Sequence, residues 1–321
     1  MTDVLGGAEP ASPLPSAGGV VAQGVRRSFG DVQAVRGIDL TAAPGEVTAL
    51  VGPNGAGKTT LLLVLATLLV PDAGDVRVAG HDPVTEPDAV RARMGWSPDV
   101  FGLYDNLTAR EYLQFVGEAY RMGRAEAGRR AAELLDLARL PEHADRPVHT
   151  MSRGQKQRLG LARALVHDPD VLLLDEPASG LDPRSRVELR DLLRRLARGG
   201  TAVIVSSHLL GDLEELADRA VFVEAGATVG EHRIDALPSS RAARPWRVRS
   251  LDDAALVRAL ADAGHEHGEP TSAGVEVRLD SDEEAADLLA ALVRDGVPVV
   301  AFSPLGGALQ AAYLELVEDE R

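Results

Sequence analysis

The stretch Gly52-Pro53-Asn54-Gly55-Ala56-Gly57-Lys58-Thr59 fits the pattern G-x-x-x-x-G-K-[ST], a glycine-rich loop that cradles phosphates. Glu46–Val51 before it is typical of a buried strand, and Thr60–Leu69 after it is typical of an apolar helix. Glycines allow backbone N–H groups to turn toward the phosphates, and the start of the helix adds a positive dipole. The alternative is a glycine-rich turn without a ligand, but every specified position matches in the expected context. The pattern therefore predicts a nucleotide site.

Two side chains of this loop have defined roles in such a site. Lys58 would bridge the β- and γ-phosphates, and the Thr59 hydroxyl would hold Mg²⁺. The chain contains only 2 lysines against 32 arginines, so a lysine here indicates a need for a compact ammonium rather than a planar guanidinium. We predict that the nucleotide contacts the whole loop, namely Gly52, Pro53, Asn54, Gly55, Ala56, Gly57, Lys58, Thr59 and Thr60.

The bulk composition limits the classes of function. The chain has 321 residues, 45% of them hydrophobic, so it can bury a large core in one or two domains. It has no cysteine, which excludes disulfides and thiolate metal sites. The net charge is −15, and residues 251–321 carry −12 of it, with 16 acidic and 4 basic side chains. No nucleic-acid partner is expected, because such proteins carry a basic surface.

Neither the N-terminus nor any apolar run predicts membrane insertion. Residues 1–19 lack a basic start and an apolar core, so we expect a disordered tail rather than a signal peptide. The longest nearly apolar run, Leu61–Val70, is shorter than the roughly 20 residues that a bilayer span needs. Because it directly follows Lys58 and Thr59, we interpret it as the buried helix after the phosphate loop.

Residues 20–235 alternate short apolar strands with helical patterns, which predicts a parallel sheet covered by helices on both faces. Residues 99–168 are almost entirely helical in pattern and predict a helical subdomain. A linker is expected near Asp235–Pro245, and residues 246–321 then predict a small C-terminal α/β accessory domain. The expected strands of the main sheet are Val47–Val51, Val76–Val78, Val171–Leu174, Ala202–Val205 and Ala220–Val223.

Two carboxylates follow one of these strands. Val171–Leu174 is continuously apolar and ends in Asp175 and Glu176. At the end of a buried strand Asp175 would lie beside the phosphate loop and hold Mg²⁺, and Glu176 could orient or deprotonate an attacking water. Many strands end in acidic residues, so the signal depends on the phosphate loop that accompanies it.

A second anion site is predicted at a helix start. Met151-Ser152-Arg153-Gly154-Gln155 opens a helical run that ends near Val166. The Ser152 hydroxyl and the backbone N–H groups of the first turn could bind an anion. Ser152 is equally suited to be an ordinary N-cap, and the pattern by itself does not decide between the two.

Together these motifs resemble, over about residues 20–235, the ATPase subunits of ABC transporters. The matches are Phe29 where the family has an aromatic that stacks on adenine, Met151–Gln155 for the signature LSGGQ, Leu174–Pro177 for the Walker B end, Ser179–Asp182 for the D-loop and His208 for the switch histidine. The resemblance implies an α/β P-loop ABC ATPase cassette with ATP and Mg²⁺ as cofactors.

The resemblance also implies roles and partners. Lys58, Glu176 and His208 would be catalytic, and Thr59 with Asp175 would hold Mg²⁺. In the family, the signature of one subunit closes over the nucleotide of another, so a homodimer or a pair of ATPase subunits is expected. This assigns contacts in trans to Ser152, Gly154 and Gln155 of the signature and to Asp182 of the D-loop.

Two positions depart from the family pattern. The glutamine of the Q-loop is Asp99 here, and an acidic residue at this position resembles the drug- and antibiotic-export branch. Arg153 replaces the first glycine of the signature; it could add charge near a γ-phosphate or point to solvent, and we expect solvent.

Six of the chain's 11 aromatic residues lie between Trp96 and Tyr120. We expect the loop residues Phe101, Leu103 and Tyr104 to contact a membrane permease, since this region receives the permease in the resembled family and aromatics are enriched at interface centres. The helically spaced aromatics, by contrast, are expected in the core; they are Tyr112, Phe115 and Tyr120.

From the resemblance we expect the chain to be the ATPase subunit of an ABC exporter of drugs or antibiotics, which acts with a separately encoded permease at the cytoplasmic face of the membrane. A soluble ABC ATPase with a non-permease partner is the alternative, but those usually carry two cassettes or a long coiled coil. A non-catalytic nucleotide-binding module is disfavoured because Lys58, Asp175, Glu176 and His208 occur together.

The C-terminal domain lacks a phosphate or metal motif and is expected to tune assembly or regulation; the alternative is a stabilising cap with no regulatory role. A last helix, Leu309–Glu318, would place an apolar face on its own domain or on a partner subunit; that face consists of Leu309, Ala312, Tyr313 and Leu316. Deletion after Pro245 is expected to spare nucleotide binding.

Overall fold

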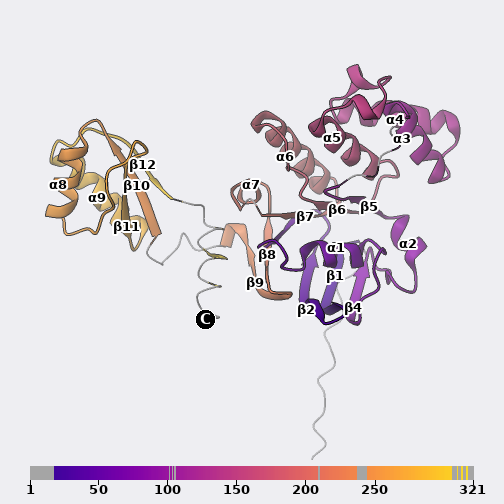
Figure 1. The fold of residues 1–321 in the computed structure, drawn as a ribbon, viewed down its shortest axis with the longest axis horizontal. Helices are drawn as coiled ribbons and strands as arrows, with labels where there is room; N and C mark the ends of the chain where they lie inside the picture. The colour runs from indigo at the N-terminus through magenta and orange to yellow at the C-terminus, as the bar shows by residue number, and fades with distance from the viewer. Residues whose placement is uncertain are drawn as a thin grey trace, which may run out of the picture.

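The computed structural model of the chain describes residues 18–100, 102, 104, 106–208, 210–236, 244–305, 309, 312, 313 and 316. Most of the predicted tail and of the predicted linker lies outside these residues, as do Phe101 and Leu103. The described part contains a large mixed α/β unit and a small α/β unit (Figure 1). This is the predicted fold class.

The large unit is built on a nine-stranded sheet with the order β4-β1-β2-β9-β8-β3-β7-β6-β5. The predicted strands are confirmed, and β3, β8, β7, β6 and β5 pair in parallel. The strands are β1 (Val20–Phe29), β2 (Val32–Ala42), β3 (Val47–Val51), β4 (Ala73–Val78), β5 (Met94–Ser97), β6 (Val171–Asp175), β7 (Ala202–Ser207), β8 (Arg219–Glu224) and β9 (Ala227–Arg233).

Four strands of this sheet were not predicted. The antiparallel β1 and β2 carry polar residues between their apolar ones and have register shifts, so their apolar runs are interrupted. β5 is only four residues long, and β9 is not fully buried. Prediction from continuous apolar runs therefore found mainly the strands that helices cover on both faces.

The core strands bury alternate side chains in two separate clusters. In β6, Leu172 and Leu174 face the cluster formed with the helical subdomain and α6 (Pro183–Arg198), whereas Val171 and Leu173 face the cluster around α1 (Lys58–Leu65). Since successive side chains of a strand point to opposite faces, an all-apolar strand requires cover on both. This arrangement fixes the carboxyl ends of β3, β6 and β7 beside one another.

The helix after the phosphate loop is shorter than predicted. α1 ends at Leu65, because Thr67 adopts a left-handed conformation with φ of 62°. Leu68 and Val70, which the sequence placed in or next to the buried helix, are exposed. The expectation for this end of the run was wrong, because apolar composition alone does not locate a helix end.

The helical subdomain contains α3 (Ala109–Ala119), α4 (Arg124–Leu137) and α5 (Arg153–Ala164), with the short α2 (Pro87–Arg91) before it. Tyr112 is buried as expected, but Phe115 and Tyr120 are 48% and 39% exposed, so their assignment to the core was wrong. Both lie at the rim: Phe115 packs edge-on against Tyr104, and Tyr120 stacks on His167 with ring centroids 3.9 Å apart.

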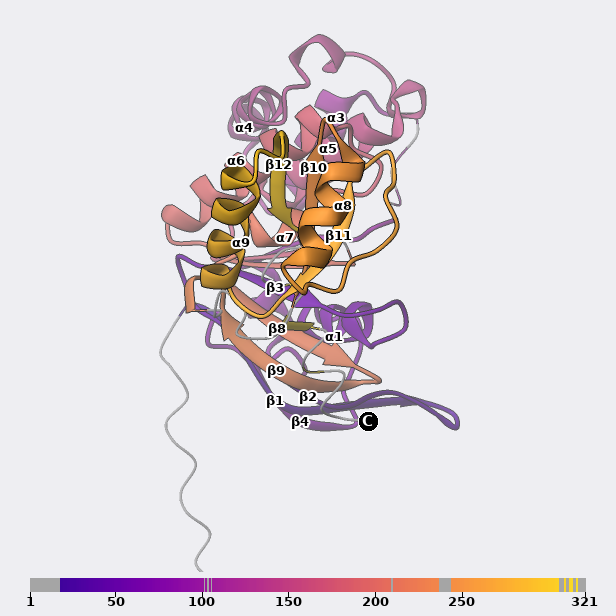
Figure 2. The same cartoon turned by 90° about the vertical axis from the view of Figure 1, so that its left-hand side faces the viewer.

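The small unit is a three-stranded antiparallel sheet with the order β11-β10-β12. Two helices lie in front of this sheet in Figure 2 and share a hydrophobic core with it. The elements are β10 (Arg244–Ser250), α8 (Asp253–Asp262), β11 (Val275–Leu279), α9 (Asp282–Arg294) and β12 (Val299–Pro304).

The last described residues return to the large unit. Leu309 is fully buried in the core cluster of the large sheet, and Tyr313 stacks on Phe222 of β8 with ring centroids 6.0 Å apart. Leu316 packs against Gly230 of β9, where a Cβ would lie 2.7 Å from its methyl group. The expected apolar face packs against the large unit of the same chain rather than against the small unit that precedes it.

Candidate nucleotide site

The phosphate loop connects β3 to α1 and depends on close backbone packing at two glycines. A Cβ at Gly52 would lie 2.1 Å from the carbonyl oxygen of Val223 in β8. Gly57 has φ of 99°, and a Cβ there would lie 2.6 Å from the carbonyl oxygen of Ala34. Only glycine fits these contacts, so the sequence fixes a loop that packs on its neighbours and begins α1 with Lys58.

Lys58 lies folded over this loop. Its Nζ donates hydrogen bonds to the carbonyl oxygens of Gly52 at 2.6 Å and Pro53 at 2.9 Å, and the residue is only 7% exposed. Burial lowers the pKa of the Lys58 ammonium below its ordinary value, while the nearby carboxylates of Glu176 and Asp175 act in the opposite direction. The side chain is thus a desolvated cation beside two carboxylates.

Thr59 and Asp175 meet across the loop. The Thr59 hydroxyl donates to Oδ2 of Asp175 at 2.9 Å, and the hydroxyl of Ser206 in β7 donates to the other oxygen, Oδ1. Asp175 is almost fully buried, so these two hydroxyls fix its orientation. The pairing register places Ser206 directly beside Asp175 at the carboxyl edge of the sheet.

Glu176 follows Asp175 in a strained backbone conformation, with φ of 48° in a residue that is not glycine. Its backbone N–H donates to the carbonyl oxygen of Ser206 at 3.1 Å. Nδ1 of His208 lies 2.9 Å from Oε1 of Glu176, and the hydroxyl of Ser207 donates to Oε2 at 3.4 Å. The end of β7 thus holds the carboxylate that follows β6.

One concave pocket collects most of the predicted phosphate-site residues. Phe29 at the end of β1 forms part of its wall, and the guanidinium carbon of Arg27 lies 5.0 Å from the centre of the Phe29 ring. Asp99, which follows β5, lies on the same pocket. The lining consists of Phe29, Ala34, Asn54, Gly55, Gly57, Lys58, Thr59, Thr60, Asp99, Asp175 and Glu176.

The donor set at this pocket fits a magnesium ion. Mg²⁺ prefers oxygen ligands and is usually held by one or two protein groups together with substrate phosphates. Thr59 and Asp175 supply a hydroxyl and a carboxylate, and Oδ1 of Asp99 is a buried oxygen without a hydrogen-bond partner. In the described part of the chain no cluster of three or more His, Cys, Asp or Glu could hold a metal unaided.

The signature begins α5 with a capping box. Ser152 accepts a hydrogen bond from the backbone of Gln155, and the Gln155 side chain accepts one from the backbone of Ser152. Gly154 lies against Leu181, since a Cβ there would contact its side chain at 3.4 Å. The N-cap reading is confirmed, and within one chain these residues do not line the phosphate pocket.

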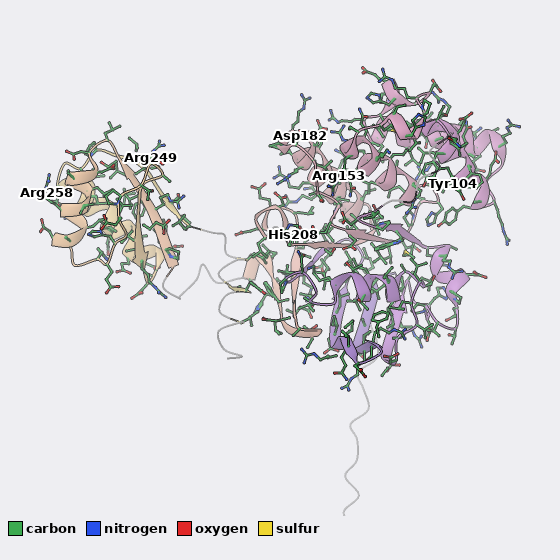
Figure 3. All side chains as sticks on the ribbon, viewed as in Figure 1. Tyr104, Arg153, Asp182, His208, Arg249 and Arg258 are labelled. Atoms are coloured by element: carbon green, nitrogen blue, oxygen red, sulfur yellow. The ribbon has the colours of Figure 1, made fainter. Side chains whose placement is uncertain are left out.

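The D-loop leads from β6 into α6. Asp182 is the N-cap of α6 and accepts a hydrogen bond from the backbone N–H of Ser185 at 3.0 Å. Hydrogen bonds from Ser185 lower the pKa of Asp182. Figure 3 labels Arg153, Asp182 and His208. The Arg153 side chain is 69% exposed, as expected. Its guanidinium also contacts Ser179 of the D-loop.

Sequence reasoning missed Ser206 and Ser207 as supports of the two carboxylates. Both directly precede His208 at the end of a predicted strand, so their position on the sheet edge was available. Their hydrogen-bond partners could not be predicted in the same way, because Asp175, for example, lies 31 residues before Ser206 in the chain. Of the aromatic loop, Tyr104 is 60% exposed and packs on Phe115.

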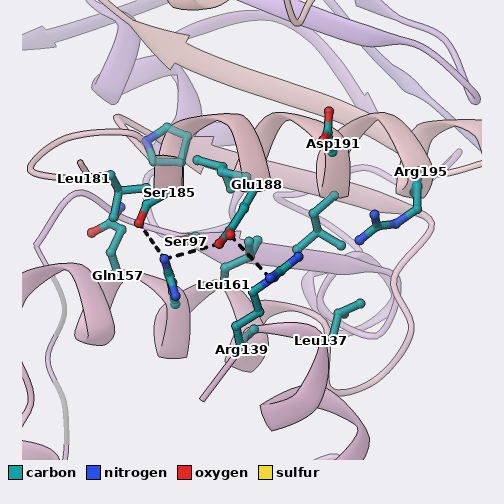
Figure 4. A pocket seen from close by; sticks show the side chains of 15 residues that line it. Ser97, Leu137, Arg139, Gln157, Leu161, Leu181, Ser185, Glu188, Asp191 and Arg195 are labelled. Atoms are coloured by element: carbon teal, nitrogen blue, oxygen red, sulfur yellow. Dashed lines mark hydrogen bonds and ion pairs between the residues drawn. The ribbon is translucent and has the colours of Figure 1, made fainter. Parts of the chain in front are cut away.

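A second cavity lies between α5 and α6 and contains none of the predicted phosphate-binding residues (Figure 4). Glu188 of α6 lies between two arginines there, 3.3 Å from Arg139 and 3.5 Å from Arg158. Arg158 also donates to the hydroxyl of Ser185 at 2.5 Å. One carboxylate is thus shared by both guanidinium groups.

Comparison with known proteins identifies the family of the chain. The sequence pattern of the family described as ABC transporter matches residues 35–179. The chain is 36% identical over 300 residues to the daunorubicin/doxorubicin resistance ATP-binding protein DrrA of Streptomyces peucetius, which covers 91% of this chain and 90% of that protein. It is 43% identical over 218 residues to the daunorubicin resistance ATP-binding protein DrrA3 of Streptomyces coeruleorubidus, 68% and 69% of the two chains.

The fold is also found among solved structures. A dimeric ATP-binding cassette in a post-hydrolysis state with ADP and phosphate is similar with a TM-score of 0.62 and 28% identity, over 67% of this chain and 98% of that one. Among the described residues, no helix is long and apolar enough to cross a membrane. The chain therefore belongs to the ABC transporter family, as one of its ATP-binding and ATP-hydrolysing subunits.

Proposed function

We propose that the chain hydrolyses Mg·ATP at the pocket around the phosphate loop and thereby drives export of an amphipathic drug or antibiotic through a separate membrane permease. The observation that carries the proposal is the meeting of Lys58, Thr59, Asp175 and Glu176 on one pocket wall. The similarity over 91% of the chain to a drug-resistance ATP-binding protein supports the direction of transport and the substrate class.

In this proposal each side chain has a separate task. Lys58 exchanges its loop carbonyls for phosphate oxygens, and its low exposure strengthens that contact. Thr59 and Asp175 would hold Mg²⁺, which when bound neutralises charge on the phosphates. Glu176 accepts a proton from, or orients, the attacking water, and His208 positions Glu176 through their hydrogen bond. Phe29 offers its exposed ring to the adenine.

A head-to-tail dimer completes the site. Ser152, Gly154 and Gln155 do not line the phosphate pocket of their own chain, so their anion-binding role requires the pocket of a second copy. Asp182 would lie at the same interface. The dimeric form of a similar cassette supports this arrangement.

In this proposal the permease contacts the exposed aromatic pair of Tyr104 and Phe115, whose ring centroids lie 5.3 Å apart. Tyr104 follows the pocket residue Asp99 by five positions in the chain, so movement of the permease would pass to the nucleotide through this segment. This contact would hold the chain at the cytoplasmic face of the membrane.

We propose a domain division in which residues 20–235 form the cassette, with residues 99–168 as its helical subdomain. Residues 246–304 form the accessory domain, since they have their own core. The segment from Leu309 to Leu316 follows the accessory domain in sequence but belongs by its contacts to the cassette.

Transport by reconstituted protein tests the function. The chain and its permease in inside-out vesicles should accumulate a fluorescent anthracycline when Mg·ATP is added, and vesicles with Lys58→Ala should not. ATP-dependent uptake of another amphipathic compound but not of the anthracycline would keep the ATPase assignment and change the substrate. Equal ATP hydrolysis by wild type and Lys58→Ala would exclude the site itself.

A further inference from the structure

The start of α5 carries an arginine that joins three segments of the chain. Ser152 caps the helix, so Arg153 is held at its first position. Nη2 of Arg153 donates to the hydroxyl of Ser179 at 3.0 Å. Its side chain lies along Gly180, which has φ of 73° and where a Cβ would lie 3.0 Å from Nε. The D-loop backbone is thus shaped to let this side chain pass.

The same guanidinium lies next to the acidic residue at the Q-loop position. Nη2 of Arg153 is 3.9 Å from Oδ1 of Asp99. This oxygen is buried and has no hydrogen-bond partner, while the Asp99 residue lines the phosphate pocket together with Asp175 and Glu176. A third carboxylate near polyphosphate is unfavourable unless a cation compensates it.

We infer that Arg153 is a positioning residue for Asp99: its positive charge holds this carboxylate and thereby links the nucleotide pocket to the signature helix and the D-loop of the same chain. The two departures from the family pattern then form a pair. Each replaces a neutral residue with a charged one, and the charges of Asp99 and Arg153 are opposite. The inference rests on the proposed nucleotide site, because Asp99 acts there.

The link has a consequence for magnesium. Asp99 would act on two cations, the Arg153 guanidinium and an Mg²⁺ that enters with nucleotide. Removal of Arg153 frees the carboxylate to act on Mg²⁺ or its water and also removes positive charge that favours a nucleotide without metal. The factor by which Mg²⁺ strengthens nucleotide binding should therefore increase.

The expected size of this effect is moderate. Both side chains are partly exposed, Arg153 at 69% and Asp99 at 40%. Couplings between such exposed ion pairs correspond to changes of about 2- to 5-fold in an equilibrium constant. The distance of 3.9 Å leaves room for a tighter contact after small rotations of either side chain.

A double-mutant cycle on ADP binding tests the inference. The dissociation constant of ADP is measured by calorimetry with Mg²⁺ and with EDTA, at concentrations where light scattering shows a monomer. Four proteins are compared: wild type, Arg153→Ala, Asp99→Asn and the double variant. Arg184→Ala is the matched control, because it removes an exposed arginine of the adjoining helix that pairs with Glu188 instead. Arg153→Lys keeps the charge, and thermal melting checks folding.

The expected result is a 2- to 5-fold larger Mg²⁺ enhancement in Arg153→Ala, with no further change when Arg153→Ala is added to Asp99→Asn. Arg184→Ala should equal wild type, and Arg153→Lys should restore most of the wild-type ratio. The link between Arg153 and Asp99 would be overturned if Arg153→Ala changed the Mg²⁺ enhancement equally in wild type and in Asp99→Asn. It would also be overturned if Arg153→Ala changed this enhancement in neither protein. Absence of ADP binding by folded wild-type protein would overturn the proposed nucleotide site together with it.

Discussion

His208 and Glu176 hydrogen-bond to each other, with Nδ1 of the imidazole 2.9 Å from Oε1 of the carboxylate. The two side chains come from the ends of adjacent parallel strands, β7 and β6. The sequence analysis treated them separately, with Glu176 assigned to the attacking water and His208 identified by resemblance as the switch histidine. In the structure they form one unit, in which the histidine holds a carboxylate on a strained backbone.

Glu176→Gln is expected to bind ATP but to lower turnover by about 10²- to 10⁴-fold, because an amide cannot accept the proton of the attacking water. The amide keeps the shape that His208 contacts. Turnover is measured by phosphate release, and light scattering with ATP should show an accumulated dimer. Turnover near the wild-type rate would remove Glu176 from catalysis.

His208→Ala is expected to lower turnover by roughly 10²-fold while the ATP dissociation constant changes little, since the imidazole positions Glu176 and does not form the phosphate loop. Combination with Glu176→Gln should add little further loss, because the two residues act as a unit. A parallel loss of binding and turnover would instead indicate a folding defect.

Lys58→Ala should abolish measurable ADP binding, and wild-type binding should weaken as the pH rises. Burial lowers the pKa of Lys58, so its ammonium loses its proton at a lower pH than an exposed lysine. The neutral amine no longer attracts phosphate, and affinity falls through that range. Lys156→Ala, at the only other lysine, should retain the same pH profile as wild type. A flat wild-type profile up to the ordinary lysine pKa would contradict the assignment.

Leu309→Ala is expected to destabilise the cassette by about 2–5 kcal/mol, because this fully buried side chain fills the core of the large sheet. Urea unfolding measures the change in free energy. Val300→Ala, at an exposed position in the accessory domain, should stay within about 0.5 kcal/mol. Deletion after Pro245 should therefore lower cassette stability, as the alternative of a stabilising cap requires. Equal free energies of unfolding for Leu309→Ala and wild type would contradict the packing of Leu309 in the cassette core.

His167 should make stability fall on the acid side. Burial lowers its pKa below the ordinary value of 6.5, and its Nδ1 is buried without a hydrogen-bond partner. As the pH falls below 6.5, the unfolded chain takes up a proton that the folded chain resists, so unfolding becomes more favourable. His167→Gln should flatten this slope in urea titrations between neutral and acid pH. Identical slopes for wild type and His167→Gln would contradict this.

The sequence by itself determined the features that neighbouring residues set. The phosphate loop and the apolar strand before Asp175 depend on residues within a few positions of one another, so their patterns could be recognised directly. Ser152 was recognised as a suitable N-cap, but its pattern left an anion site open as well. The core strands were predicted because burial on both faces demands unbroken apolar runs. The C-terminal unit was recognised for a different reason, since short strand-like segments alternate with amphipathic helical segments along its sequence.

Only the tertiary structure decided which of these local pieces meet. His208 contacts Glu176 across 32 residues, Arg153 reaches Asp99, and the segment at Leu309 returns to the core of the large sheet. The same holds for Phe115 and Tyr120, whose helical spacing gave no sign that they would lie at the rim. The physical reason is that periodicity reports how a segment folds and which face is apolar, whereas the partner of that face depends on the packing of residues distant in sequence.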